Sequence, residues 1–230
     1  MKNINDEYRW LTHNHRDERS DNFKTIGLTP YMWMLEMDQK EFYISGGLSR
    51  PAEFRIDDFE EMEKRFEEVK TLNHDFIVEG TYGFLVSDKH KSFFMSLKQK
   101  DIVLHPAIII GEREEKDDAI FEGYWLIPKP HRPLSWVNLE KSKYRMQNDN
   151  SLELNYLRSV ELKQSLKEIP LEERLYFNIA HMYEDSSKTY ISEFLVHNSI
   201  AEYIAQNDRT EQTLLLTTEE IHEDPGSLYN

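Results

Sequence analysis

The chain has 230 residues, of which 39% are hydrophobic and 12% aromatic, so it can bury a core and is not expected to be disordered. Acidic residues outnumber basic ones by 43 to 28, and the formal charge of -15 repels phosphate backbones, which disfavours direct binding to nucleic acid. The chain contains no cysteine, which excludes disulfides and cysteine-ligated metals and fits a cytoplasmic protein.

No segment is typical of a membrane span or a secretory leader. Unbroken apolar runs such as Ala107–Ile110 are far too short to cross a bilayer. Residues Met1–Trp10 include Asp6 and Glu7 and lack the apolar centre of a signal peptide. We therefore expect a cytoplasmic protein without membrane partners.

The N-terminal third predicts strands around a few aromatic residues. Residues 1–22 are polar apart from Tyr8 and Trp10, which favours a loose arm with one packed strand or turn. The segments Tyr31–Leu35 and Glu41–Ile44 are rich in aromatic residues and flank a polar turn, so they predict a hairpin.

The clearest predicted helix covers residues 57–70. Four apolar residues recur at helical spacing and define its buried face: Phe59, Met62, Phe66 and Val69. Asp57 and Glu60 fit a capping box at its start. Its outer face is an acidic ridge, and a short strand is predicted next, at Phe76–Val78.

Two stretches of the chain are alike at a fixed offset. Phe84-Leu85-Val86 and Phe194-Leu195-Val196 each precede a helical pattern and a second apolar run. Ser87 is expected to cap the first helix, and Ser199 is expected to form a capping box with Glu202 at the second. Each stretch therefore predicts a strand, a capped helix and another strand.

Between and after these stretches, the pattern predicts further strands. Residues 105–127 predict a hairpin with a charged tip at residues 111–118, and three prolines after it favour an extended segment. A strand is predicted at Arg158–Lys163.

The repeated stretches predict an α+β protein of two related lobes. Each lobe is expected to hold one strand–helix–strand unit on a mixed or antiparallel sheet. We place the N-terminal lobe at residues 1–147, with helix 57–70 and the first unit, and the C-terminal lobe at residues 148–230, with the second. The polar segment at residues 148–150 is the candidate linker.

No pattern in the sequence indicates catalysis, a cofactor or a metal. Gly46-Gly47 is not part of a phosphate-binding loop motif, and His13-Asn14-His15 has no further ligand pattern beside it. Neither an HExxH nor a GxSxG motif is present. We expect a protein that binds rather than an enzyme, although an unrecognised carboxylate site remains an alternative.

Several blocks resemble a family of bacterial immunity proteins from polymorphic-toxin systems. Val86–Lys91 is similar to the family's "V-S-E-K-F-K" helix start, and Asn138–Tyr144 is similar to its "D-W-E-K-S-E-Y" segment. Ile169–Phe177 matches its "I-P-E-E-R" stretch, and Val196–Asn198 stands at the second "V-S-E" start. His197, Asn198 and Asn138 depart from the family pattern, and the order of the blocks carries the resemblance over about residues 75–216.

The resemblance implies an immunity protein that neutralises a cognate toxin by binding it and occluding its active face. The acidic charge favours a basic toxin, such as a nuclease with a basic substrate groove. The alternative is an acidic scaffold or regulatory module without a toxin partner, which would use the segment from Trp125 to Trp136 as a peptide groove. We expect partner contacts at two acidic groups and these two aromatic residues: Glu60, Glu61, Glu63, Glu67, Glu68, Glu112, Glu114, Glu115, Asp117, Asp118, Trp125 and Trp136.

Overall fold

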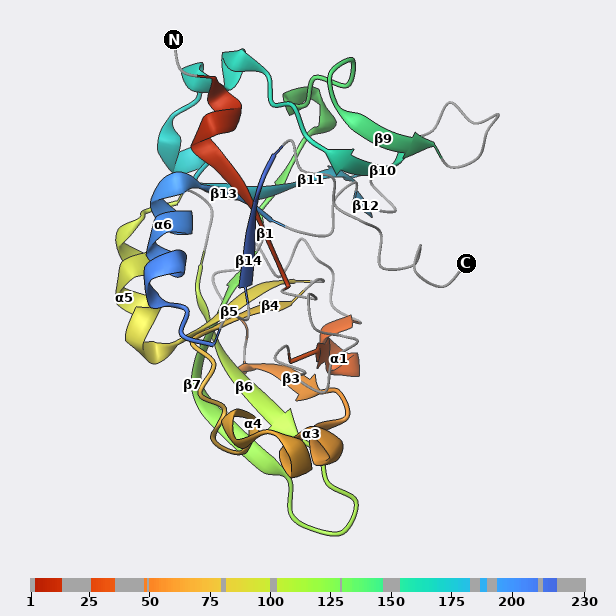
Figure 1. The fold of residues 1–230 in the computed structure, drawn as a ribbon, viewed down its shortest axis with the longest axis vertical. Helices are drawn as coiled ribbons and strands as arrows, with labels where there is room; N and C mark the ends of the chain where they lie inside the picture. The colour runs from red at the N-terminus through yellow and green to blue at the C-terminus, as the bar shows by residue number, and fades with distance from the viewer. Residues whose placement is uncertain are drawn as a thin grey trace. The chain divides into compact units, whose positions relative to one another are not determined.

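The computed structural model describes residues 3–13, 26–35, 48, 50–79, 82–99, 103–128, 130–146, 154–182, 187–189, 194–210 and 213–218. Helices and mixed and antiparallel sheets occur together in these residues, which confirms the α+β class (Figure 1). The chain forms two compact units: unit 1 comprises Met1–Leu11, Pro130–Tyr203 and Leu215–Asn230, and unit 2 comprises Thr12–Lys129 and Ile204–Leu214. The lobe boundary expected between residues 147 and 148 lies within unit 1 of this division.

Unit 2 contains a mixed six-stranded sheet. Its strands are, in spatial order, β2 (Leu28–Pro30), β3 (Ala52–Ile56), β6 (His105–Gly111), β7 (Ala119–Pro128), β5 (Gly83–Ser87) and β4 (Phe76–Glu79). β3 runs parallel to β6, and the other neighbouring pairs are antiparallel. The strand predicted at Phe76–Val78 and the hairpin predicted at residues 105–127 are confirmed.

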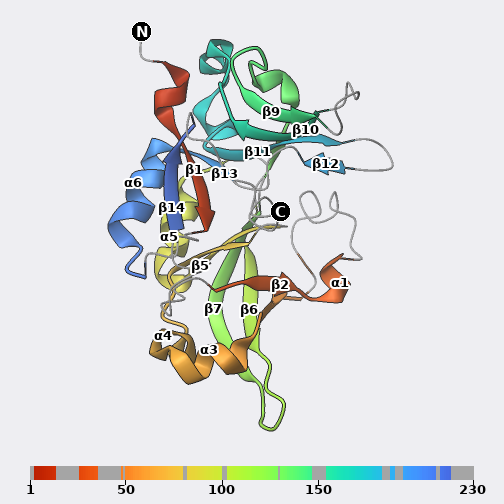
Figure 2. The ribbon, with the colours of Figure 1, turned by 45° about the vertical axis from the view of Figure 1, so that its right-hand side comes forward.

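Helices cover both faces of this sheet. On one face, α3 (Phe59–Arg65) and α4 (Glu67–Thr71) bury Phe59, Met62 and Val69 in a core with Leu85 of β5. On the other face, Phe94 of α5 (Asp88–Ser96) meets the neighbouring Phe84 edge to face, with 5.4 Å between ring centroids. The alternation of side chains along β5 therefore divides its apolar residues between two helical layers. Figure 2 shows α3 and α4 beside the β6 and β7 strands from a second direction.

The second sheet contains strands from both ends of the chain. Its spatial order is β12 (Ser187–Thr189), β11 (Tyr176–Met182), β13 (Phe194–His197), β1 (Tyr8–His13) and β14 (Thr213–Thr217), with β8 (His131–Arg132) parallel to β11. The described residues add a hairpin of β9 (Lys143–Met146) and β10 (Leu154–Ser159), the helix α6 (Asn198–Asn207) and four 3-10 turns: η1 (Ile4–Glu7), η3 (Leu134–Trp136), η4 (Gln164–Glu168) and η5 (Leu171–Glu173). The division between the units passes through β1, α6 and β14.

Residues Tyr8–Leu11 of the N-terminal strand pack firmly in unit 1. Tyr8 and Trp10 are fully buried, and β1 pairs antiparallel with β13. The Tyr8 hydroxyl donates to the Arg174 carbonyl at 2.9 Å and accepts from the Arg174 guanidinium at 2.8 Å. Burial raises the pKa of Tyr8 to about 12, so the hydroxyl keeps its proton at neutral pH. The packed strand predicted in residues 1–22 is confirmed. The described part of this segment, residues 3–13, forms η1 and β1 and not the expected loose arm.

The two repeated stretches both fold as strand–helix–strand units, as predicted. The first is β5, α5 and β6, and the second is β13, α6 and β14. In each case one strand separates the two strands of the unit: β7 lies between β5 and β6, and β1 lies between β13 and β14. In the first unit the separating strand, β7, comes directly after β6 in the chain. In the second unit the separating strand, β1, comes from the N-terminal segment.

The predicted helix caps are wrong, because other bonds engage the side chains. Ser87 makes no cap bond and donates to Asp75 at 2.6 Å, while Asp57 accepts from Thr29 at 2.8 Å. At α6, Nδ1 of His197 accepts the Ser199 backbone N–H at 3.2 Å, so a histidine ring occupies the position expected for a serine cap.

Three predicted elements also change. The helix expected at residues 57–70 starts at Phe59 and breaks at Phe66, whose backbone is extended. Residues Met32–Leu35 form the short helix α1 instead of a strand, and the hydroxyl of Tyr82 donates to the Met34 carbonyl there at 2.5 Å. Only Arg158 and Ser159 of the strand predicted at residues 158–163 lie in a strand.

The hairpin partner expected at residues 41–44, the glycine pair, most of the His13-Asn14-His15 segment and the linker at residues 148–150 lie outside the described residues.

The cap at α6 predicts that stability depends on pH. Burial disfavours the charged ring of His197 and lowers its pKa below the ordinary value of 6.5, and the neutral ring accepts the Ser199 N–H. The stabilisation is therefore complete above pH 6.5 and is lost as the pH falls through the folded value. We expect His197→Asn, which keeps an acceptor that does not titrate, to lose less thermal stability than the wild type between neutral and mildly acidic pH. Parallel melting curves for the two proteins would contradict the assignment.

Candidate functional site

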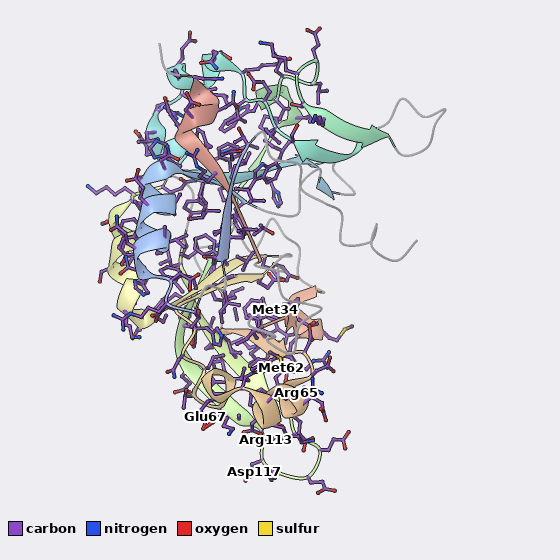
Figure 3. The ribbon with its side chains drawn as sticks, viewed as in Figure 1. Met34, Met62, Arg65, Glu67, Arg113 and Asp117 are labelled. Carbon is purple, nitrogen blue, oxygen red and sulfur yellow. The ribbon has the colours of Figure 1, made fainter. Side chains whose placement is uncertain are left out.

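The structure brings the two predicted acidic groups together in unit 2. Phe59, the first residue of α3, packs directly over Gly111 at the end of β6, where an added Cβ would lie 2.5 Å from three atoms of the ring. The helix is therefore seated on the base of the β6–β7 hairpin. Figure 3 shows the two elements, with Met62 and Arg65 labelled on α3 and Arg113 and Asp117 labelled on the hairpin below it.

Arg113 fastens the tip of the hairpin to the helix. Its guanidinium donates to both carboxylate oxygens of Glu63, with 2.9 Å from Nε to Oε2, and it lies 5.4 Å from the centre of the Phe59 ring. Across the tip, the same guanidinium donates to the Asp117 carbonyl at 2.9 Å, while the Arg113 backbone N–H donates to Asp118 at 3.1 Å. The bonds from Arg113 hold the pKa of Glu63 below its usual value.

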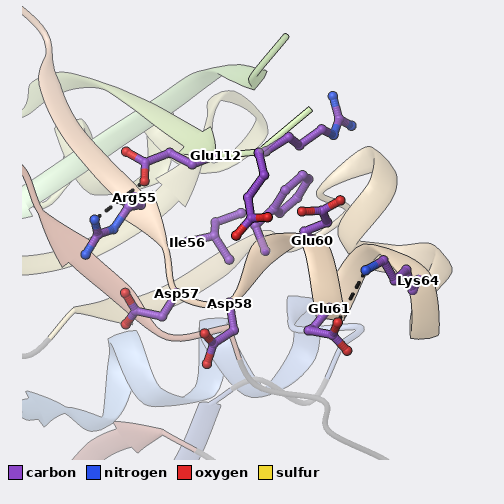
Figure 4. A pocket seen from close by; sticks show the side chains of 11 residues that line it. Arg55, Ile56, Asp57, Asp58, Glu60, Glu61, Lys64 and Glu112 are labelled. Carbon is purple, nitrogen blue, oxygen red and sulfur yellow. Dashed lines mark hydrogen bonds and ion pairs between the residues drawn. The ribbon is translucent and has the colours of Figure 1, made fainter. Parts of the chain in front are cut away.

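A pocket opens where the helix and the hairpin meet, and we call it the acidic pocket. Its volume is about 760 Å³. Six carboxylates and three cations line it together with two apolar residues: Arg55, Ile56, Asp57, Asp58, Phe59, Glu60, Glu61, Lys64, Glu112, Arg113 and Glu114. Figure 4 shows carboxylates reaching it from α3, from the turn before α3 and from the hairpin. The pocket has a net negative charge and suits a cationic group.

The ion pairs at the rim of the acidic pocket are exposed. Lys64 lies 3.3 Å from Glu61, and Arg55 lies 3.5 Å from Glu112, with all four side chains about half exposed or more. Pairs of this kind typically contribute only about 0–1 kcal/mol, so a partner can replace them at little cost. Glu112 also accepts from the Tyr31 hydroxyl at 2.9 Å, and burial together with this bond raises the pKa of Tyr31 to about 12.

The remaining predicted acidic residues are placed differently. Glu67 lies on α4, beyond the break at Phe66, and pairs with Lys70 at 2.6 Å. Glu115 and Asp117 are exposed in the tip outside the pocket lining. The side chain of Glu68 lies outside the described residues.

The two predicted aromatic contacts belong to different units. Trp125 is half-buried in unit 2, where its indole N–H donates to Asp88 at 2.5 Å and Lys91 lies 3.2 Å from the ring centre. Trp136 belongs to unit 1 and packs edge to face on Phe177 at 5.1 Å. Each ring is therefore engaged within its own unit.

Sequence reasoning missed residues that shape the acidic pocket. The sequence pattern predicts Asp57 as a helix cap and gives no role to Asp58. Asp58 adopts a left-handed backbone conformation with φ of 51° and makes no cap bond. Arg113 was overlooked because it lies in a charged run, where its pairing with Glu63, fifty positions earlier, leaves no local signal. The only available hint was the Asp-Asp pair at a strand-to-helix turn, where Asp tolerates left-handed backbone.

In the part of the chain that the structure describes, no three His, Asp or Glu side chains are grouped as metal ligands require. No helix there has the length and apolarity to span a membrane. Comparisons with known proteins found no matching protein-family model and no matching curated protein. The resemblance to immunity proteins therefore stays a prediction from the sequence.

The contact between Phe59 and Gly111 can be tested by a double-mutant cycle. Gly111→Ala forces a methyl group into the ring, and overpacking of this kind typically costs about 1–3 kcal/mol. In Gly111→Ala/Phe59→Leu the smaller side chain relieves the clash, so we expect the double variant to lose less unfolding free energy than the sum of the single variants. Additive losses in chemical denaturation would show that the two residues do not interact.

Proposed function

We propose that this protein is a bacterial immunity protein that binds a cognate toxin and neutralises it by covering the toxin's active face. The observation that carries the proposal is the convergence of α3 and the β6–β7 hairpin on one acidic pocket. These are the two segments that the sequence indicated as partner contacts, and they are far apart in the chain. The order of sequence blocks that resembles the immunity family supports the same function.

The electrostatics indicate which toxins suit this surface. A net charge of -15 accelerates the encounter with a basic partner and disfavours competing contacts with nucleic acid. Asp58, Glu60 and Glu114 form no ion pair with any described residue, so their charges are available to a partner. Carboxylates spaced around a pocket can take the place of substrate phosphates, and we therefore propose a toxin with a basic substrate groove, such as a nuclease. A cytoplasmic location, where such a toxin acts, fits the absence of cysteine.

The alternative, a scaffold that binds peptides between Trp125 and Trp136, has less support. The two rings belong to different units, and each makes contacts with its own neighbours. No arrangement within a single unit combines them into a groove.

The proposal is tested by co-expression. The gene immediately upstream is expressed with and without this protein, and growth is measured. We expect the upstream product to be toxic and this protein to restore growth. A harmless neighbour, or toxicity that this protein does not relieve, would overturn the immunity proposal.

The surface assignment is tested by reversing charge at the acidic pocket and hairpin tip. The variant carries lysine in place of Glu60, Glu61, Glu114 and Glu115. We expect it to associate with the toxin about tenfold more slowly, or slower still, at low salt, because electrostatic steering is lost. Melting temperature should stay close to that of the wild type, since these side chains are exposed or half-buried. The matched control reverses four exposed carboxylates of unit 1, namely Glu140, Glu168, Glu172 and Glu202. Equal slowing by both sets would mean that net charge alone, and not this surface, governs binding.

A further inference from the structure

A second, smaller pocket lies next to the acidic pocket, and we call it the apolar pocket. Its volume is about 290 Å³, close to the lower end for ligand sites, which suits a single inserted side chain. Its lining combines apolar and charged residues: Gly27, Asp57, Asp58, Glu61, Met62, Arg65 and Phe66. Three of these residues, Asp57, Asp58 and Glu61, line both pockets.

The break in the helix creates this pocket. At Phe66 the backbone turns extended, with φ of -124° and ψ of 124°, so α3 ends and α4 begins in a new direction. The ring of Phe66 is only partly buried against the core, beside the buried Met62. A continuous helix, as the sequence predicts, would carry Phe66 fully into the core. The break instead leaves an apolar wall open beside charged residues.

The opposite side of the pocket is fixed by Gly27 and Asp57. The Asp57 backbone N–H donates to the Gly27 carbonyl at 3.1 Å, and the Asp57 carboxylate accepts from Thr29 at 2.8 Å. A Cβ at position 27 would lie 3.2 Å from that carboxylate, so the glycine keeps the approach to Asp57 open. The Asp57 carboxylate is therefore already bound within the fold, by the Thr29 hydroxyl.

Asp58 differs from Asp57 in the use of its carboxylate. The Asp58 carboxylate makes no bond to the helix that follows it and no ion pair with a described residue. The backbone is nevertheless held at φ of 51°, a conformation that costs most L-residues about 1–2 kcal/mol. This unusual turn places the Asp58 carboxylate at the boundary between the acidic and apolar pockets, where none of its contacts with described residues requires it.

Charge complementarity decides what the apolar pocket can accept. Three carboxylates face one cation, and that cation, Arg65, already lies 3.8 Å from Glu61. An anionic ligand is therefore repelled, and a neutral apolar group alone would leave Asp58 unpaired. We propose that the apolar pocket receives an apolar side chain of the toxin that is followed in sequence by a lysine or arginine, with Asp58 pairing with that cation. The identity of the partner rests on the proposed function, whereas the recognition chemistry does not.

The chemistry can be measured without any toxin. The protein is labelled at its methionine methyl groups, and the NMR signal of Met62, which lines the apolar pocket, is followed as short peptides with blocked termini are added. The probe is Gly-Leu-Arg-Gly. Gly-Ser-Arg-Gly keeps the charge and removes the anchor, and Gly-Leu-Glu-Gly keeps the anchor and reverses the charge. We expect saturable shifts with the first peptide, and affinity weaker by at least about tenfold without the leucine.

Asp58→Asn tests the carboxylate, because asparagine keeps the shape and tolerates the left-handed backbone. We expect it to weaken binding of Gly-Leu-Arg-Gly by about two- to fivefold, as for an exposed ion pair, with an unchanged melting temperature. Asp117→Asn removes the same charge from the hairpin tip outside both pockets and should leave affinity unchanged.

Three outcomes would overturn the inference: no shift of Met62 with any peptide, equal binding of all three peptides, or a shift that grows with protein concentration alone. The last would show that a second copy of the chain occupies the pocket. Peptide binding without growth rescue would remove the immunity function and leave this recognition chemistry standing. Growth rescue without peptide binding would remove this recognition chemistry and leave the immunity function standing.

Discussion

The packing of the Phe59 ring on the bare backbone of Gly111 joins α3 to the β6–β7 hairpin, and the acidic pocket depends on that contact. A side chain at position 111 would push the helix away, because its Cβ would lie 2.5 Å from ring atoms, which is closer than van der Waals contact allows. Arg113 then completes the junction by pairing with Glu63 and bonding across the tip. Without this junction, the carboxylates of α3 and of the hairpin would be two separate charged surfaces.

The same junction explains how so many carboxylates gather at low cost in stability. The positions closest to the junction are neutralised internally, with Glu63 bound to Arg113 and Glu112 near Arg55. The outer positions, such as Glu60 and Glu114, lie where water screens their repulsion. The carboxylates are therefore paired near the core and unpaired with described residues at the edge, which supports the proposal of a basic partner.

Much of the fold could be predicted because it follows from local patterns. Alternating and helical apolar spacing identified the hairpin of β6 and β7, the strand β4 and both strand–helix–strand units. Prediction failed where distant contacts decide the structure. Ser87 binds Asp75 rather than its helix, Met32–Leu35 forms a helix contacted by Tyr82, and β1 joins a sheet whose other strands all follow residue 130.

The candidate site shows the same limit. Its residue types were visible as two runs of carboxylates, but their convergence was not, because the pairing of Glu63 with Arg113 spans fifty positions. Asp58 was also hard to find, since the Asp-Asp pair at a strand-to-helix turn is only a weak signal of a left-handed backbone. The break at Phe66, which opens the apolar pocket, interrupts a helical pattern that is continuous in the sequence.

We propose that the acidic pocket of unit 2 is the surface that meets the toxin. Hydrogen–deuterium exchange of the protein, alone and in complex with the toxin, distinguishes this surface from those of unit 1. We expect slower exchange on binding at residues 55–64 and 112–114, with unchanged exchange at Lys143–Met146 and Leu171–Glu173 of unit 1. Slower exchange confined to unit 1, with the helix and the hairpin tip unaffected, would contradict it.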